Sequence, residues 1–156
     1  MLKNKPTRIL ALDFGFVRIG VAVSDPQKII ATPFDNITGS RDVAVAAAHV
    51  AIFLKEIQEK KGCVISQIVV GLPLLLNGGD SERTQAVRAF VQALAEKVDV
   101  PIELFDERLT SVQAERSLIS GDVRRDKRKQ LVDRVSAVIL LQTYLDKEAY
   151  KKQHSE

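Results

Sequence analysis

Residues 8–25 constrain the fold of this chain more than any other stretch, because they place a carboxylate on an apolar strand. The apolar run at residues 9–12 ends in Asp13, Gly15 follows two residues later, and a second strand-like run begins near Ile19. This pattern predicts a β-hairpin whose first strand is buried. A buried charge is costly unless it is paired, hydrogen-bonded or bound to a metal. Asp13 is therefore a candidate functional residue, and a carboxylate that caps a turn is the alternative.

The composition favours a single globular domain over residues 1–156. The chain is 46% hydrophobic, and a domain of this size buries roughly 70% of its unfolded surface. No apolar run approaches the ~20 residues of a membrane span, and no signal peptide is visible at the N-terminus. One cysteine, Cys63, agrees with a reducing compartment, and with only His49 and His154 beside it a zinc site of the Cys/His type is excluded. We expect a cytoplasmic protein that does not associate with membranes.

Hydrophobic periodicity predicts an α/β fold. Strands are expected near residues 8–14, 18–24, 29–38, 67–71 and 101–105, and helices near 42–61, 81–97, 111–120 and 127–147. Ser40 is expected to cap the first helix and Gly62 to end it. The later strands are separated by helices and should pair in parallel through right-handed crossovers. The order predicts a mixed five-stranded sheet, with the first three strands antiparallel and helices on both faces.

Acidic residues recur where such a sheet would bring them together. Asp106 and Glu107 follow the last strand, and Asp133 lies in the last helix on a face that is otherwise small or apolar. Oxygen ligands without cysteine or histidine suit Mg²⁺ or Mn²⁺, and two such ions can stabilise the attacking and leaving oxygens of phosphodiester hydrolysis. The candidate metal ligands are Asp13, Asp106, Glu107 and Asp133. The alternatives are surface ion pairs, of Asp133 with Arg134 or Lys129 and of Glu107 with Arg108.

Basic residues supply a candidate nucleic-acid surface. The net charge of +3 is mild, but a dense basic cluster precedes and begins the last helix. Such a cluster fits the phosphate backbone of a nucleic acid, and a solvated loop and helix start is the alternative. Arg18, in the hairpin turn, is placed to reach a phosphate. The candidate nucleic-acid-binding residues are Arg18, Arg108, Arg124, Arg125, Lys127 and Arg128.

Four segments in order resemble one known family. They are residues 13–25 (DFGFVRIGVAVSD), 70–73 (VGLP), 106–110 (DERLT) and 133–137 (DRVSA). Their order and spacing are similar to those of the YqgF family, also called RuvX, the bacterial pre-16S ribosomal RNA nucleases. The resemblance covers residues 8–146. It implies a ribonuclease H-like three-layer fold, one nuclease domain, and phosphodiester cleavage that depends on Mg²⁺ or Mn²⁺. It also implies processing of the 5′ end of the 16S precursor in the bacterial cytoplasm.

The same resemblance implies roles for individual acids. Asp13 matches the family's first-strand acid, Glu107 the acid of its Asp-Glu-Arg motif with Asp106 a close rival, and Asp133 its last-helix acid. Asp13, Glu107 and Asp133 are therefore the expected catalytic residues. Structured precursor rRNA is the expected partner of a monomer or homodimer. A Holliday-junction-type DNA endonuclease, which needs a dimer, and a non-catalytic nucleic-acid-binding factor are the alternatives. An ATP-binding lobe of the sugar-kinase and actin type is disfavoured, because those proteins need two lobes.

Overall fold

A computed structural model describes residues 4–110 and 125–154, with residues 125–135 described as backbone only. The strands are β1 (Thr7–Asp13), β2 (Arg18–Ser24), β3 (Ala31–Thr38), β4 (Val64–Leu72) and β5 (Ile102–Asp106). The helices are α1 (Val43–Lys61), α2 (Glu82–Ala95), the short 3-10 helix η2 (Glu107–Leu109) and α4 (Arg125–His154). The helix predicted near 111–120 lies outside the described residues.

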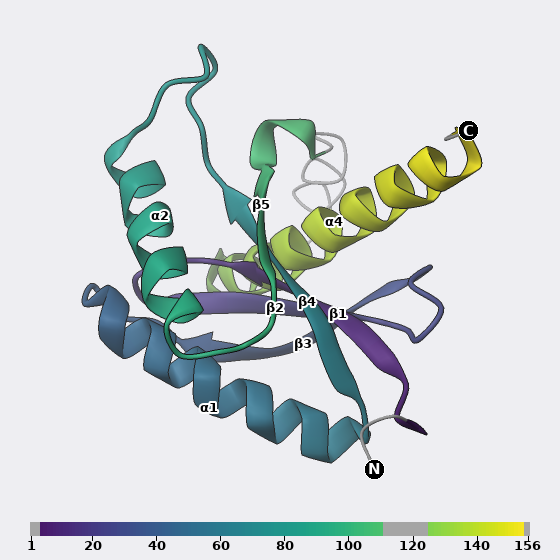
Figure 1. Cartoon of the computed structure of the whole chain (residues 1–156). Helices are drawn as coiled ribbons and strands as arrows, with labels where there is room; N and C mark the ends of the chain where they lie inside the picture. Colours follow the sequence, from purple (N-terminus) through teal and green to yellow (C-terminus); the bar gives the residue numbers. More distant parts are fainter. Residues whose placement is uncertain (1–3, 111–124, 155–156) are drawn as a thin grey trace.

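The five strands form one mixed sheet in the order β3-β2-β1-β4-β5 (Figure 1). β1 and β3 run antiparallel to β2, whereas β1, β4 and β5 are parallel to one another. The predicted antiparallel opening and the parallel pairing of the later strands are therefore confirmed. Because β1, β4 and β5 point the same way, their carboxyl ends meet at one edge of the sheet.

Helices cover both faces, which gives the predicted three layers. Leu10 and Leu12 of β1 pack into the core beneath α1 and α2. Ala11, between them in sequence, faces the other way and packs in a second core with Ala22 and with Ala137 of α4. This alternation follows from the pleat of a strand, where successive side chains point to opposite faces. The three small side chains let α4 lie close to the sheet.

The start of α1 differs from the sequence prediction, and its end confirms it. The N-cap of α1 is Asp42 and not Ser40, since the Asp42 carboxylate accepts a hydrogen bond from the amide of Ala44 at 3.0 Å. The Ser40 hydroxyl instead accepts from the amide of Asp42 at 3.1 Å. Gly62 ends the helix as predicted, in the left-handed conformation with φ of 59° that glycine adopts without strain.

No helix in the described ranges is both long enough and apolar enough to cross a membrane.

Candidate functional site

The carboxyl ends of three parallel strands define the candidate site. Asp13 is the last residue of β1 and Asp106 the last of β5, and β4 lies between them. The register pairs Leu12 with Val70, so the next position brings Asp13 level with Gly71. On the other side of β4, Gly71 pairs with Phe105. The sheet itself therefore brings Asp13 and Asp106 to the same edge.

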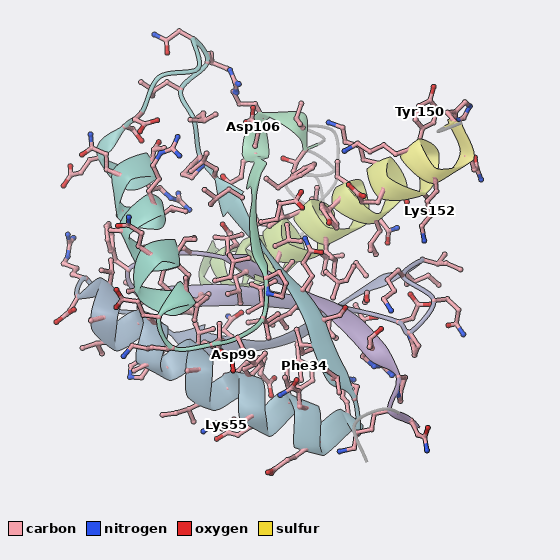
Figure 2. The ribbon with its side chains drawn as sticks, in the orientation of Figure 1. Phe34, Lys55, Asp99, Asp106, Tyr150 and Lys152 are labelled. Atoms are coloured by element: carbon pink, nitrogen blue, oxygen red, sulfur yellow. The ribbon has the colours of Figure 1, made fainter. Side chains whose placement is uncertain are left out.

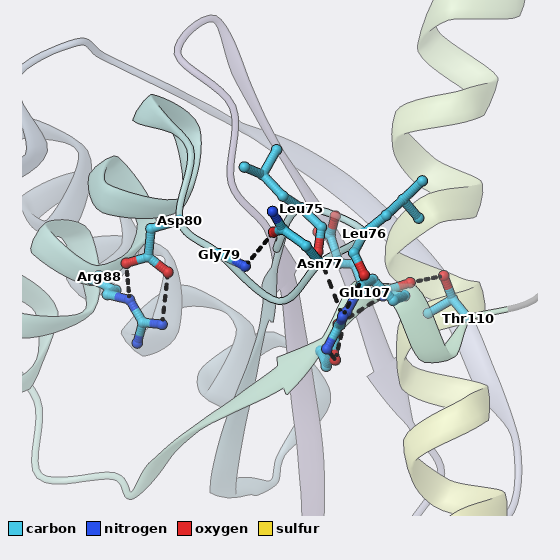
Figure 3. Close-up of polar contacts among 10 residues, drawn as sticks. Leu75, Leu76, Asn77, Gly79, Asp80, Arg88, Glu107 and Thr110 are labelled. Atoms are coloured by element: carbon cyan, nitrogen blue, oxygen red, sulfur yellow. Dashed lines mark hydrogen bonds and ion pairs between the residues drawn. The ribbon is translucent and has the colours of Figure 1, made fainter.

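Glu107 lies directly over Gly71. It begins η2 just beyond β5, and its Oε1 lies so close to Gly71 that a β-carbon there would collide with it. Thr110 fixes the turn, because its hydroxyl donates to the Glu107 carbonyl at 2.6 Å (Figure 3). Alternation along β4 directs position 71 to the α4 side of the sheet, as for Val69. The same alternation along β1 places Asp13 on that side.

The adjacent acid, Asp106, is held by a different partner. Arg108 donates from Nε at 3.0 Å and from Nη2 at 2.7 Å to the Asp106 carboxylate, which also accepts from the backbone amide of Arg108. The hydrogen bonds from Arg108 lower the pKa of the Asp106 carboxyl below its ordinary value. The ion pair considered from sequence, between Glu107 and Arg108, is therefore wrong: Arg108 binds Asp106. Figure 2 shows Asp106 at the β5 end of the sheet edge.

Arg108 also anchors the loop that follows β4. Its Nη1 donates to the carbonyl oxygen of Leu76 at 3.2 Å. Within the loop, the amide of Gly78 donates to the Leu75 carbonyl at 2.8 Å. The amide of Gly79 donates to the side chain of Asn77 (Figure 3). Leu76 at the loop is 95% exposed. The guanidinium that sequence analysis assigned to phosphate binding thus also has a structural role.

Arg83 contacts Asp13, which sequence analysis did not anticipate. Its Nη2 lies 3.7 Å from Asp13 Oδ1 and donates to the carbonyl of Phe14 at 3.2 Å. The Asp13 side chain is 13% exposed, so most of its surface is withdrawn from water. One local signal could have pointed to Arg83. It lies in the first turn of α2, after the Ser81 N-cap, where the helix dipole disfavours a cation.

Most of the remaining predicted site residues have side chains outside the part of the chain that the structure describes. The backbone of Asp133 lies in α4, one turn before the buried Ala137, and its side chain is outside the described part of the chain. Arg125, Lys127 and Arg128 lie in the same backbone-only stretch of α4, and Arg124 lies outside the described residues. Arg18, at the start of β2, lines an open pocket of about 430 Å³ beside the hairpin. These assignments stay predictions.

The oxygen donors among the described residues are of the kind that bind a hard cation, but they do not form a complete metal site. Across residues 4–110 and 136–154, no three Asp, Glu, His or Cys side chains are grouped closely enough to hold a metal ion. Asp13 and Glu107 nevertheless offer oxygen donors on one side of the sheet, and Gly71 leaves the space that the Glu107 carboxylate fills. Oxygen ligands of this kind are those that Mg²⁺ and Mn²⁺ prefer. Asp133 is the residue that would add the third carboxylate.

Comparison with known proteins identifies the family. A family profile described as "RuvX: Holliday junction resolvase" matches residues 7–147. A relative from Protochlamydia amoebophila is 44% identical over 92% of this chain and 96% of its own. One from Endomicrobium trichonymphae is 41% identical over 89% and 95%. Both are provisionally named pre-16S rRNA nucleases.

A solved structure shares the fold at low sequence identity. It is that of T. thermophilus RuvC in complex with a Holliday junction substrate, which aligns with a TM-score of 0.54 at 11% identity. The alignment covers 94% of this chain and 96% of that one. The mixed sheet with helices on both faces is therefore a ribonuclease H-like fold, shared with this RuvC structure. The chain belongs to the RuvX family, and it is a phosphodiester-hydrolysing nuclease.

Proposed function

We propose that this protein is a divalent-metal-dependent nuclease that processes the 5′ end of the 16S rRNA precursor. The observation that carries the proposal is that Asp13 and Glu107 lie on the same face of the sheet. Asp13 is level with Gly71 on the adjacent strand, and the Glu107 carboxylate lies against Gly71. The names of the relatives from Protochlamydia amoebophila and Endomicrobium trichonymphae support the RNA substrate. The whole chain then acts as one nuclease domain in the cytoplasm, where the precursor is made.

In this proposal Asp13, Glu107 and Asp133 are the catalytic acids and hold Mg²⁺ or Mn²⁺. When bound, one or two of these metal ions would act as Lewis acids and stabilise charge on the phosphate oxygens. Asp106 differs from Glu107 because Arg108 already engages both of its oxygens. We therefore assign Asp106 to positioning, where it orients Arg108 and the first turn after β5. Among residues 4–110 and 136–154, no group donates to the Glu107 carboxylate, and we assign this carboxylate to metal binding.

The chain's own residues would bind the substrate and orient it. Arg18 and Arg108 lie at the edge that carries the acids, within reach of a strand crossing it. The basic start of α4, with Arg124, Arg125, Lys127 and Arg128, would extend this surface along the RNA backbone. Guanidinium groups bind phosphate oxygens through two parallel hydrogen bonds, which fixes the strand as well as attracting it. The RNA strand would therefore be held in one position relative to the carboxylates.

The direct test compares two substrates under the same conditions. A labelled 16S precursor with its 5′ leader and a synthetic four-way DNA junction are incubated with the full chain in Mg²⁺, in Mn²⁺ and in excess chelator. We expect cleavage of the precursor at its 5′ side with either ion, and none in chelator. Calcium should not substitute, because it prefers longer bonds and looser geometry. Undiminished cleavage in chelator would contradict metal dependence.

A junction-resolving DNA nuclease is the second candidate. It is favoured by the family's description and by the fold shared with RuvC bound to a Holliday junction. That activity requires two sites in a two-fold dimer. Selective cleavage of the four-way junction, together with a dimeric mass in solution, would favour it over RNA processing. A non-catalytic binding factor would cleave neither substrate and would tolerate loss of Asp13.

A further inference from the structure

An open pocket beside the carboxylate edge is lined by three arginines from three separate segments of the chain. Its lining consists of residues 14–18 of the β1–β2 hairpin together with Arg41 and Arg83. Arg18 begins β2, Arg41 precedes α1, and Arg83 lies in the first turn of α2. No acidic side chain is among the lining residues. The pocket therefore brings together three arginines from segments that are far apart in the sequence.

Arg41 is held in place before any ligand binds. Its guanidinium carbon lies 4.8 Å above the ring centre of Phe16, a cation–π contact. Phe16 packs edge-on against Phe14 at 5.8 Å, and Phe14 contacts the buried Phe90 at 4.6 Å. This aromatic series connects the exposed guanidinium to the core. A side chain held in this way loses less entropy when it binds a ligand.

The backbone of the pocket is equally well defined. The amide of Gly39 donates to the Val17 carbonyl at 2.9 Å, which attaches the hairpin loop to the end of β3. A β-carbon at Gly15 would collide with the carbonyl oxygen of Arg18, and one at Gly39 with that of Gly15. The close approach of these segments therefore requires glycine at both positions. The loop that carries Arg18 is packed against its surroundings.

Arg83 connects the pocket to the proposed catalytic edge. Its Nη2 is 3.7 Å from Asp13 Oδ1 and donates to the Phe14 carbonyl at 3.2 Å. The Arg83 side chain is still 55% exposed, so part of the guanidinium remains open to solvent and ligand. An anion bound in the pocket would therefore lie next to Asp13, the acid at the end of β1.

We propose that Arg18, Arg41 and Arg83 form a phosphate-binding pocket that holds a phosphate of the nucleic-acid strand adjacent to the one being cleaved. The inference rests on the proposed nuclease function and extends it to two arginines, Arg41 and Arg83, outside the predicted nucleic-acid-binding set. Arginines that line one pocket suit a phosphate, because each guanidinium offers a planar fork of donors. The bound group is either a terminal 5′-monophosphate or an internal phosphodiester, which share this chemistry.

The test measures binding in chelator, so that cleavage and metal ions play no part. The variant R41Q R83Q removes two positive charges from the pocket. The matched control K55Q K97Q removes the same charge from exposed positions in α1 and just after α2, away from the pocket. Each protein is titrated with a short single-stranded RNA carrying a 5′-phosphate, and with the same RNA carrying a 5′-hydroxyl, at several salt concentrations.

We expect R41Q R83Q to bind RNA about tenfold or more weakly than the control, as for the loss of hydrogen bonds to a charged group. The slope of log K against log salt should fall by about 0.7 for each lost phosphate contact. A loss confined to the phosphorylated RNA assigns the pocket to a terminal monophosphate. An equal loss on both RNAs assigns it to an internal phosphodiester.

Equal affinity and salt slope for R41Q R83Q and K55Q K97Q would overturn the inference. The single variants R41Q and R83Q are measured alongside, with thermal melts, so that a folding defect in the double variant does not decide the result. Failure of the nuclease proposal has a different signature. In that case the wild-type chain cleaves neither the precursor nor the junction, whatever the pocket variants do to binding.

Discussion

Glu107 lies so close to Gly71 that its carboxylate fills the space a side chain at position 71 would need. The two residues come from adjacent parallel strands, with Gly71 near the end of β4 and Glu107 just past β5. The absence of a β-carbon on Gly71 therefore allows the Glu107 carboxylate to lie there. Its position relative to Asp13 follows from the register on the other side of β4.

We expect G71A to impair cleavage more than folding. The added methyl group would displace the flexible end of Glu107, and its backbone neighbours need not move. Cleavage should fall roughly tenfold or more, because misplacing a catalytic group by about 1 Å costs on the order of 100-fold. The melting temperature should change little. S66A, at the exposed start of β4, is the control, and full activity of G71A would contradict the role of Glu107.

Asp13→Asn should separate chemistry from binding. The amide keeps the shape of the carboxylate but loses the charge that would hold a cation, so cleavage should fall by more than roughly 100-fold. Even residues that only support metal ligands cost about 10–100-fold when changed. RNA affinity measured in chelator should persist. D35N, at an exposed position of the edge strand β3, controls for the loss of one charge. Equal activity of D13N and D35N would remove Asp13 from the mechanism.

R108Q should loosen the loop after β4. Arg108 connects Asp106 to the carbonyl of Leu76, and the hydrogen bonds inside the loop depend on that anchor. The amides of Leu75 and Gly78, which donate within the loop, should exchange with solvent deuterium several-fold faster in R108Q. D106N should show a smaller effect in the same direction, because it keeps a neutral acceptor. Unchanged exchange in both variants would mean that the loop is held by other contacts.

Asp25 should make stability depend on pH in the acid range. Its Oδ1 accepts from the amides of Ile30 at 2.8 Å and Ile29 at 2.7 Å, and the bond from Ile30 is the main reason that the pKa of this carboxyl lies below its ordinary value of 3.8. A lowered folded-state pKa means that the stabilisation is present above pH about 4 and is lost as pH falls through the folded pKa.

Denaturant unfolding of the wild type and D25A across roughly pH 2–7, which spans the titration of an aspartate, tests this expectation. The wild type should be more stable than D25A at neutral pH, and the difference should shrink on acidification. D99A, at an exposed position between α2 and β5, is the matched control for the removal of one aspartate. A difference between wild type and D25A that does not vary with pH would contradict the role of the charge.

Ala137→Leu should push α4 away from the sheet. Ala137 is fully buried against Ala11 and Ala22, and three small side chains leave no space for a larger one. Overpacking of this kind costs about 1–3 kcal/mol of unfolding free energy. Because α4 also carries Asp133, cleavage should fall further than stability alone explains. A149L, at an exposed position of α4, is the control. Wild-type stability of A137L would show that the helix–sheet contact is looser than the structure indicates.

Much of the architecture could be predicted from local patterns. The apolar runs that become β1 and β2, and the helices that separate the later strands, determine the mixed sheet and the parallel pairing at its centre. Those patterns also place Asp13 and Asp106 at one edge, since parallel strands end on the same side. Gly62 was correctly predicted as the end of α1, because the left-handed conformation strongly favours glycine.

Where two neighbouring residues offer the same chemistry, the sequence could not choose between them. Ser40 and Asp42 are both good N-caps, and the path of the chain after β3 selects Asp42. Asp106 and Glu107 are both acids, and only the folded chain shows that Arg108 turns back to Asp106 while Glu107 extends over Gly71. Such choices depend on side-chain directions that periodicity does not encode.

The sequence by itself determined which segments form the sheet, because hydrophobic periodicity and turn residues act over a few neighbouring positions. It also determined the family, through four short segments in a fixed order. Only the tertiary structure brought Arg41 and Arg83 to the same pocket as Arg18, and Arg83 to Asp13. These residues are separated by tens of positions in the chain. Their convergence depends on how α1 and α2 pack against the sheet, which no local pattern specifies.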